Sequence, residues 1–181
     1  MSLILKDLLS LCAEAESAAD RHETAAREAV RKLVAPKGKV DPALLEREQF
    51  AAHGFAWIAT YVAALRQMRR WAESGHDGEL EQLILQAAFG EYLAQLKGGI
   101  AISQVEIVRP ADLGANAAAL EASAVAKLIA ANTSAVRLRI AELIADGLDT
   151  GGLPALRADG DPRPAAHHAE RGAGGDEARG C

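Results

Sequence analysis

The aromatic residues of this 181-residue chain are confined to one stretch, and that stretch most constrains the fold. They are Phe50, Phe55, Trp57, Tyr61, Trp71, Phe89 and Tyr92. Because an aromatic side chain buries a large area, they should dominate the energetics of whatever core or interface they enter. The stretch is typical of two helices, FAAHGFAWIATYVAALRQMRRWAE and GELEQLILQAAFGEYLAQLK, joined by the polar turn SGHDG. We therefore expect a helical hairpin at the centre of the fold.

The first of these two helices should start at Asp41-Pro42 and run to about Ala72. Asp can accept a hydrogen bond from an early backbone N–H, and proline suits the first helical position. Its expected apolar seam is Phe50, His53, Trp57, Tyr61, Ala64, Met68 and Trp71. On this seam Trp57 and Tyr61 should be largely buried and Trp71 at least partly. Gly54 should permit close packing against the preceding helix.

The preceding helix is expected over residues 3–34. Apolar residues recur there at alternating steps of three and four, which gives one continuous seam. The seam is Ile4, Leu8, Leu11, Ala15, Ala18, His22, Ala26, Ala29 and Leu33. Its later members are mainly alanine, so a neighbouring helix could approach closely. Pro36 and Gly38 should end the helix, since proline cannot continue it.

The rest of the ordered chain is predicted to be helical except for one segment. Helices are expected over about 79–97, 116–131 and 134–145. Residues 100–114 have no helical rhythm and are rich in β-branched residues. Since one strand cannot make a sheet, we expect an extended packed loop or a short helical turn there. The predicted fold class is an all-α bundle of about five helices.

A change in composition after Asp149 predicts the domain organisation. Residues 151–181 hold seven of the 16 glycines and contain no valine, isoleucine or aromatic residue. Such a segment cannot bury enough apolar area to offset the entropy lost on ordering. We expect a helical domain over residues 1–148 and a disordered tail over 149–181 that is dispensable for stability.

Charge, hydropathy and cysteine usage exclude several classes of protein. The net charge of −5 leaves no basic surface of the kind that binds nucleic acid. No apolar run reaches the roughly 20 residues that a membrane span needs. The N-terminal MSLILKDLLSLCAEAE does not resemble a secretory signal, because Lys6 lies inside its apolar run. We expect a cytoplasmic protein in which Cys12 is a small buried residue. Cys12 and Cys181 fit neither a disulfide framework nor a zinc site.

The histidines give no metal-binding pattern. They are His22, His53, His76, His167 and His168. None has another histidine three or four residues away, which is the usual spacing of helical ligands. We expect no metal site, and we interpret His22 and His53 as core histidines with satisfied hydrogen bonds.

Carboxylates and arginines near the aromatic stretch offer alternatives that the sequence leaves open. The carboxylates are Glu79, Glu81, Glu91 and Glu106. Glu91, on a largely apolar helix, could be a buried base with a raised pKa, although a solvated or arginine-paired glutamate is favoured. A second set, Arg66, Arg69 and Arg70, could face a phosphate, although a solvated helix end is favoured. Phosphate-binding glycine motifs are absent, so we assign no catalytic or cofactor-binding residue.

Two long segments carry a family resemblance. HGFAWIATYVAALRQMRRWAE, followed by ELEQLILQAAFGEYLAQLKGGIAISQVEIVRPADLG, resembles the amino-terminal extension of methylsuccinyl-CoA dehydrogenases. The most specific pieces are GEYLAQL at Gly90–Leu96 and EIVRPADLG at Glu106–Gly114. The resemblance covers about residues 1–148. These enzymes are flavoproteins of the acyl-CoA dehydrogenase superfamily that act in the ethylmalonyl-CoA pathway.

The resemblance implies an accessory domain and no chemistry of its own. In the family a separate core binds FAD and the CoA thioester and carries the glutamate that abstracts the α-proton. This chain contains no sequence resembling that core, so no catalytic residue can be transferred and no bound cofactor is expected. We hypothesise that the glycine-rich tail is the product of a wrong or truncated reading frame.

Two classes of function follow from these observations. The first is an accessory domain of an acyl-CoA dehydrogenase, whose partner is the dehydrogenase core or a second copy bound through helical surfaces. The second is an independent helical module for protein interaction. In the first class we expect the segment Ile100–Gly114 to contact the core, with Ile107 and Val108 at the contact.

Overall fold

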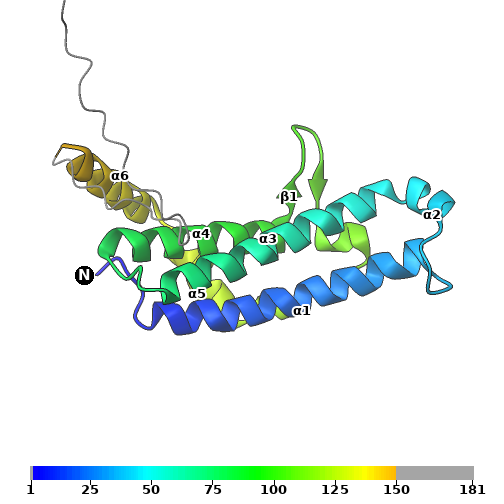
Figure 1. Cartoon of the computed structure of the whole chain (residues 1–181), viewed down its shortest axis with the longest axis horizontal. Coiled ribbons are helices and arrows are strands. Elements are labelled where there is room, and N and C mark those ends of the chain that lie inside the picture. The colour runs from blue at the N-terminus through cyan, green and yellow to red at the C-terminus, as the bar shows by residue number, and fades with distance from the viewer. Residues whose placement is uncertain (1, 150–181) are drawn as a thin grey trace, which may run out of the picture.

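The computed structural model describes residues 2–149 of the chain and confirms an all-α bundle (Figure 1). Within these residues there are six α-helices, two short strands and two 3-10 helices. The α-helices are α1 (Leu8–Val34), α2 (Pro42–Arg47), α3 (Gln49–Glu73), α4 (Glu79–Gly98), α5 (Ser123–Ala131) and α6 (Ser134–Asp149). Of the predicted tail, residues 149–181, Asp149 ends α6, and residues 150–181 lie outside the described residues.

Four helices enclose the core, and a fifth lies at one end. α1 packs along α3 and α5, while α4 packs against α3 and α5 (Figure 1). α6 contacts α4 at the end of the bundle where α4 begins. No helix within residues 2–149 combines the length and the apolarity that a membrane crossing would require.

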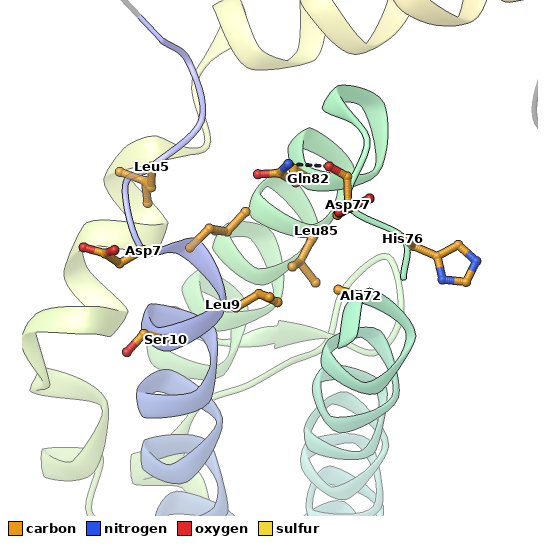
Figure 2. Close-up of a pocket in the computed structure, with 10 residues that line it drawn as sticks. Leu5, Asp7, Leu9, Ser10, Ala72, His76, Asp77, Gln82 and Leu85 are labelled. Atoms are coloured by element: carbon orange, nitrogen blue, oxygen red, sulfur yellow. Dashed lines mark hydrogen bonds between the residues drawn. The ribbon is translucent and has the colours of Figure 1, made fainter. Parts of the chain in front are cut away.

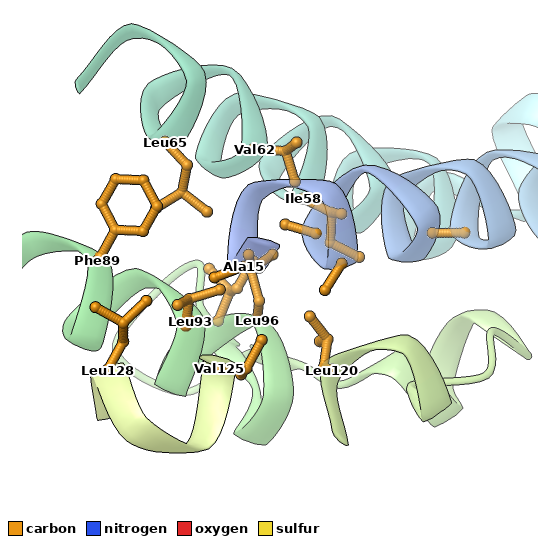
Figure 3. Packing of buried hydrophobic residues seen from close by; sticks show 14 of the residues in the cluster. Ala15, Ile58, Val62, Leu65, Phe89, Leu93, Leu96, Leu120, Val125 and Leu128 are labelled. Atoms are coloured by element: carbon orange, nitrogen blue, oxygen red, sulfur yellow. The ribbon is translucent and has the colours of Figure 1, made fainter. Parts of the chain in front are cut away.

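The core is built mainly from leucine, valine and alanine (Figure 3). α4 contributes Phe89, Leu93 and Leu96, which are fully enclosed. α1 contributes small buried residues: Ala15, Ala18, Ala19 and Ala26. The prediction that the alanine seam of α1 would face a close neighbour is confirmed, because α3 packs along it.

The predicted seam of α3 is wrong by one position. The buried residues of α3 are Ala51, Gly54, Ile58, Val62, Leu65 and Ala72. Trp57 and Tyr61, predicted to be largely buried, are only half-buried, and Phe50 is exposed. Trp71 is half-buried, which confirms the prediction of partial burial. Both series repeat with the period of a helix, so periodicity alone could not distinguish them. Close packing on the alanines of α1 leaves room for small and medium side chains, which moves the large rings to the edge.

The predicted helix over 41–72 is interrupted at Glu48, which separates α2 from α3. Its predicted start is confirmed. Asp41 caps α2, with its carboxylate accepting hydrogen bonds from the backbone N–H groups of Ala43 at 2.9 Å and Leu44 at 3.3 Å. Glu48 has φ −103° and ψ 28°, outside helical geometry. The break reorients the chain before the aromatic part of α3.

The first helix begins at Leu8, later than predicted, and the buried side chain of Gln86 binds the backbone of the residues that precede it. The side-chain oxygen of Gln86 accepts a hydrogen bond from the Leu5 N–H at 2.8 Å. Its side-chain nitrogen donates to the Leu3 carbonyl at 3.0 Å. Gln86 thus supplies hydrogen-bond partners to the backbone of Leu3 and Leu5. These hydrogen bonds compete with those that the same groups would form in a helix.

The segment 100–114 forms a β-hairpin, so the prediction of a packed loop is wrong for its first half. β1 (Ile100–Ala101) pairs antiparallel with β2 (Ile107–Val108), with Ile100 opposite Val108. The segment contains both strands, so the argument that a single strand cannot make a sheet does not apply to it. The hairpin projects away from the helices (Figure 1). The predicted short helical turn is present as the 3-10 helix Pro110–Leu113.

Candidate docking surface

A groove with a mixed apolar and polar lining lies between the α2–α3 junction and the β-hairpin. Its volume is about 570 Å³. The residues that line it are Leu45, Gln49, Phe50, Ala52, His53, Ile102 and Glu106. We call this feature the docking groove. It is built from two stretches of chain about fifty residues apart, which the packing of the hairpin on α3 brings together.

Large apolar side chains are exposed at the docking groove. Leu45 is 40% exposed and Phe50 is 41% exposed. Val105, which precedes Glu106 in the hairpin, is 91% exposed. Single exposed apolar residues are common on proteins, but a hollow lined by several of them, including an aromatic, is typical of an interaction surface.

A row of rings, exposed at His53 and half-buried beyond it, continues from the docking groove along α3 to Tyr92 of α4. We call His53, Trp57, Tyr61 and Tyr92 the aromatic stripe. The indole N–H of Trp57 donates a hydrogen bond to Nε2 of His53 at 2.9 Å. The Trp57 and Tyr61 rings meet edge to face at 6.4 Å, and those of Tyr61 and Tyr92 lie 4.6 Å apart. Because these contacts hold the rings in place, a partner would lose little conformational entropy in ordering them.

The base of the hairpin is fixed against α3 by a glycine. A Cβ at Gly54 would lie 2.6 Å from Cγ1 of Val108 and 3.4 Å from Leu113. Gly54 therefore allows the hairpin and the following 3-10 helix to approach α3, which corrects its expected role against α1. Val108 is buried, whereas Ile107 is 43% exposed. Of the two residues predicted to contact a core, only Ile107 is available at the surface.

The two histidines interpreted as core residues, His22 and His53, lie in different environments. His22 is fully buried, as predicted, but neither ring nitrogen has a hydrogen-bond partner. Burial lowers the pKa of His22, an effect that the nearby backbone of Asn116 only partly opposes. The prediction is wrong for His53, which is exposed beside the docking groove. His76 stacks on Trp71 with ring centroids 4.7 Å apart. The remaining pair, His167 and His168, lies outside the described residues.

The arginine-paired alternative is confirmed for Glu91. Glu91 is exposed, and its carboxylate accepts hydrogen bonds from Arg137 at 3.1 Å and Asn132 at 3.2 Å. Glu79 is paired with Arg139, whose two nitrogens donate at 2.8 and 3.0 Å. That hydrogen bonding lowers the pKa of the Glu79 carboxyl. Neither glutamate is a candidate base held in a dry site.

Glu106 differs from these two carboxylates. Among residues 2–149 it forms no ion pair. Within the part of the chain that the structure describes, the one hydrogen bond to its carboxylate comes from the hydroxyl of Ser103, which donates at 3.4 Å. Glu106 therefore places an unneutralised negative charge at the docking groove.

Two of the three arginines that were candidates for an anion site are occupied by α1. Arg66 donates to Glu23 at 2.6 Å and to Asp20 at 2.9 Å. Arg69 donates to Glu16 at 2.5 Å. The expectation of a solvated helix end is wrong for Arg66 and Arg69, because both tie α3 to α1 over partly buried carboxylates. Their donors are not presented to an external phosphate.

A second cavity, of about 420 Å³, opens at the opposite end of the bundle (Figure 2). Leu5, Leu9 and Leu85 line it, and the ring of His76 points away from it. Across residues 2–149, no group of three His, Cys, Asp or Glu side chains is placed to hold a metal ion. Cys12 is fully buried as predicted, and burial raises the pKa of its thiol to about 12. The docking groove differs from this cavity in carrying the exposed side chains of Leu45 and Phe50, which makes it a candidate surface for association.

Comparison with known proteins shows that the chain is similar to part of an enzyme. No protein-family model matches the chain. A (2S)-methylsuccinyl-CoA dehydrogenase from Cereibacter sphaeroides is 47% identical to it over 148 residues, which is 79% of this chain. This chain is similar to part of a methylsuccinyl-CoA dehydrogenase. The resemblance predicted from the sequence is confirmed. The chain spans only 27% of the length of that dehydrogenase, which is consistent with an accessory part without the catalytic core.

The sequence predicts only part of the docking groove. Ile102 and Glu106 lie within Ile100–Gly114, the segment expected to contact a core, whereas Leu45 carries no sequence signal and His53 fits the predicted core seam of α3. The signal that could have indicated the groove is the run of β-branched residues around Gln104, which can pair with itself across a turn. The break at Glu48, which exposes Leu45 beside Phe50, has no comparable sequence signal.

Proposed function

We propose that residues 1–148 form an accessory helical domain of an acyl-CoA dehydrogenase of the methylsuccinyl-CoA dehydrogenase type. The observation that carries the proposal is the 47% identity to a restricted part of such an enzyme. From the same resemblance we propose that the complete enzyme uses FAD, acts in the ethylmalonyl-CoA pathway and is cytoplasmic. The domain itself supports the dehydrogenase part and does not oxidise substrate.

The chemistry of the described residues supports a non-catalytic role. Oxidation of an acyl-CoA thioester needs a base at the α-carbon and a flavin that receives hydride, with the protein positioning both. The two buried carboxylates, Glu16 and Glu23, are engaged by Arg69 and Arg66. A carboxylate held by an arginine in this way is not free to approach a substrate. The base and the flavin site therefore belong to the rest of the enzyme.

An independent interaction module is the second candidate function. The docking groove and the aromatic stripe support it, because both would suit an unrelated helical partner. The two candidates differ in one respect that can be measured, namely whether the chain acts on a methylsuccinyl-CoA dehydrogenase.

The test combines this protein with the C. sphaeroides enzyme from which the matching region has been deleted. Flavin absorbance and circular dichroism first establish that the shortened enzyme is folded. We expect no oxidation of methylsuccinyl-CoA by the 181-residue protein alone, even with added FAD. We expect that adding it raises the activity or the unfolding temperature of the shortened enzyme. Turnover by the chain alone, or no effect on a folded shortened enzyme, would contradict the proposal.

A further inference from the structure

We infer that the docking groove is the face of this domain that the dehydrogenase part covers. An apolar side chain of that part would sit between Leu45, Phe50 and Ile102, with a lysine or arginine of the same segment beside Glu106. The inference rests on the proposed function and specifies the contact through which it operates.

The form of the groove supports the first half of this inference. It is a hollow of about 570 Å³, within the size range of pockets that enclose a ligand-sized group. Its apolar lining comes from α2, α3 and the hairpin, so a bound side chain would touch three elements. Removing Leu45 and Phe50 from water would supply the apolar gain that drives association.

The charge at the groove identifies the chemistry of the partner. Glu106 is the one acidic residue among those that line it, and no described cation neutralises it. Covering a carboxylate without an opposite charge carries a large desolvation cost. A segment that seats an apolar residue here must therefore bring a cation to Glu106. A purely apolar or acidic segment would be rejected.

The comparison identifies the dehydrogenase part as the source of that segment. In the C. sphaeroides enzyme nearly three quarters of the chain lies outside the matching region, which makes up 27% of it. A segment linked to the domain in one polypeptide is present at high effective concentration. The ordered rings beside the groove favour such a permanent contact, because the aromatic stripe is fixed before docking.

The experiment uses a chimera in which residues 1–149 of this chain replace the matching region of the C. sphaeroides enzyme. Two groove variants are made, Glu106→Lys and Leu45→Ser. Each has a matched control at a distant exposed site. Glu14→Lys reverses a charge on α1, and Leu138→Ser removes an apolar side chain of α6 that is 62% exposed. Circular dichroism of the same variants in the 181-residue chain verifies that the bundle still folds.

We expect the unsubstituted chimera to be folded and active. The groove variants should lose at least tenfold in kcat/KM or unfold at a temperature several degrees lower, while the controls match the unsubstituted chimera. Groove variants that behave like the controls in a working chimera would overturn the inference and leave the proposed function standing. An unfolded or inactive unsubstituted chimera would contradict both.

The oligomeric state of the 181-residue chain tests a different occupant of the groove. We expect sedimentation to report a monomer. A dimer that Glu106→Lys dissociates, and that Glu14→Lys leaves intact, would show that a second copy covers the groove. That result would also overturn the inference.

Discussion

The two apolar faces of α3 are offset by one residue and differ in what they contain. The inner face carries Ile58 and Val62, which are buried against the bundle. The outer face carries Trp57 and Tyr61, which remain half-exposed. On α3, large rings are thus found where the bundle is open and compact side chains where it is tight, whereas the ring of Phe89 on α4 is enclosed in the core. The comparison teaches that side-chain size in a bundle reports the space between helices, and that a row of aromatics can mark an interface instead of a core.

The small residues of α1 are the cause of this division. Ala15, Ala18, Ala19 and Ala26 bring the backbone of α1 close to its neighbours. Protein interiors are packed to the density of organic crystals, so a bulky ring has no place in such a seam. The aromatic side chains keep the helical period but gather at the edge, where the docking groove begins.

Truncation of Leu65 to alanine should break the inner face and have the largest effect. Leu65 is fully buried, so its loss removes apolar contacts and leaves a cavity. We expect the free energy of unfolding to fall by about 2–5 kcal/mol. Urea denaturation followed by circular dichroism measures it. A loss below about 1 kcal/mol would show that the inner face is loosely packed and that the comparison fails.

Truncation of Trp57 to alanine tests the outer face by the same measurement. A buried tryptophan would cost about 3–5 kcal/mol. Because Trp57 is half-exposed and packs only along one edge of the core, we expect about 1–2 kcal/mol. The comparison is sharpened if Leu65→Ala costs more than Trp57→Ala, although leucine is the smaller residue. A larger loss of unfolding free energy for Trp57→Ala than for Leu65→Ala would show that Trp57 is a core residue.

The two histidines extend the comparison to pH. Burial lowers the pKa of His22 in the folded protein, so below about pH 6.5 the unfolded chain binds the additional proton. The stability contributed by neutral His22 is complete above that pH and is lost as the pH falls toward the folded pKa. The slope should reach at most about 1.4 kcal/mol per pH unit.

The measurement is the free energy of unfolding between pH 7.5 and 5 for three proteins. The variant His22→Leu should remove part of the acid dependence. The matched variant His53→Leu makes the same substitution at an exposed position and controls for the loss of an imidazole ring. Equal pH profiles for the parent and His22→Leu would show that His22 is protonated within the fold.

Substitution of Val105 by aspartate should have the smallest effect on folding. Val105 is 91% exposed, and surface substitutions of this kind usually change stability by less than about 0.5 kcal/mol. The matched variant Val108→Asp buries a charge at the base of the same hairpin, so thermal denaturation should show it to be severely destabilised. Similar unfolding temperatures for the two variants would mean that the hairpin is not packed on α3.

The sequence by itself determined the helical class and most helix ends. The helical period of the apolar residues, the cap at Asp41-Pro42 and the turn at Ser74–Gly78 are local properties, and they predicted the start of α2, the end of α3 and the whole of α4. The resemblance to methylsuccinyl-CoA dehydrogenases rests on segments such as Glu106–Gly114 and required no structure. These features follow from residues close together in the chain, whose preferences act without help from the rest of the fold.

Only the tertiary structure decided which side of α3 faces inward and where the docking groove lies. Periodicity defines the faces of a helix, but the neighbour that covers a face is set by packing between distant segments. The orientation of Trp57 depends on the alanines of α1. The groove forms because Gly54 allows the hairpin to pack closely on α3, which places Ile102 and Leu45 on the lining of the same hollow. Each of these outcomes depends on how much space remains between two elements, a quantity that does not exist until both are in place.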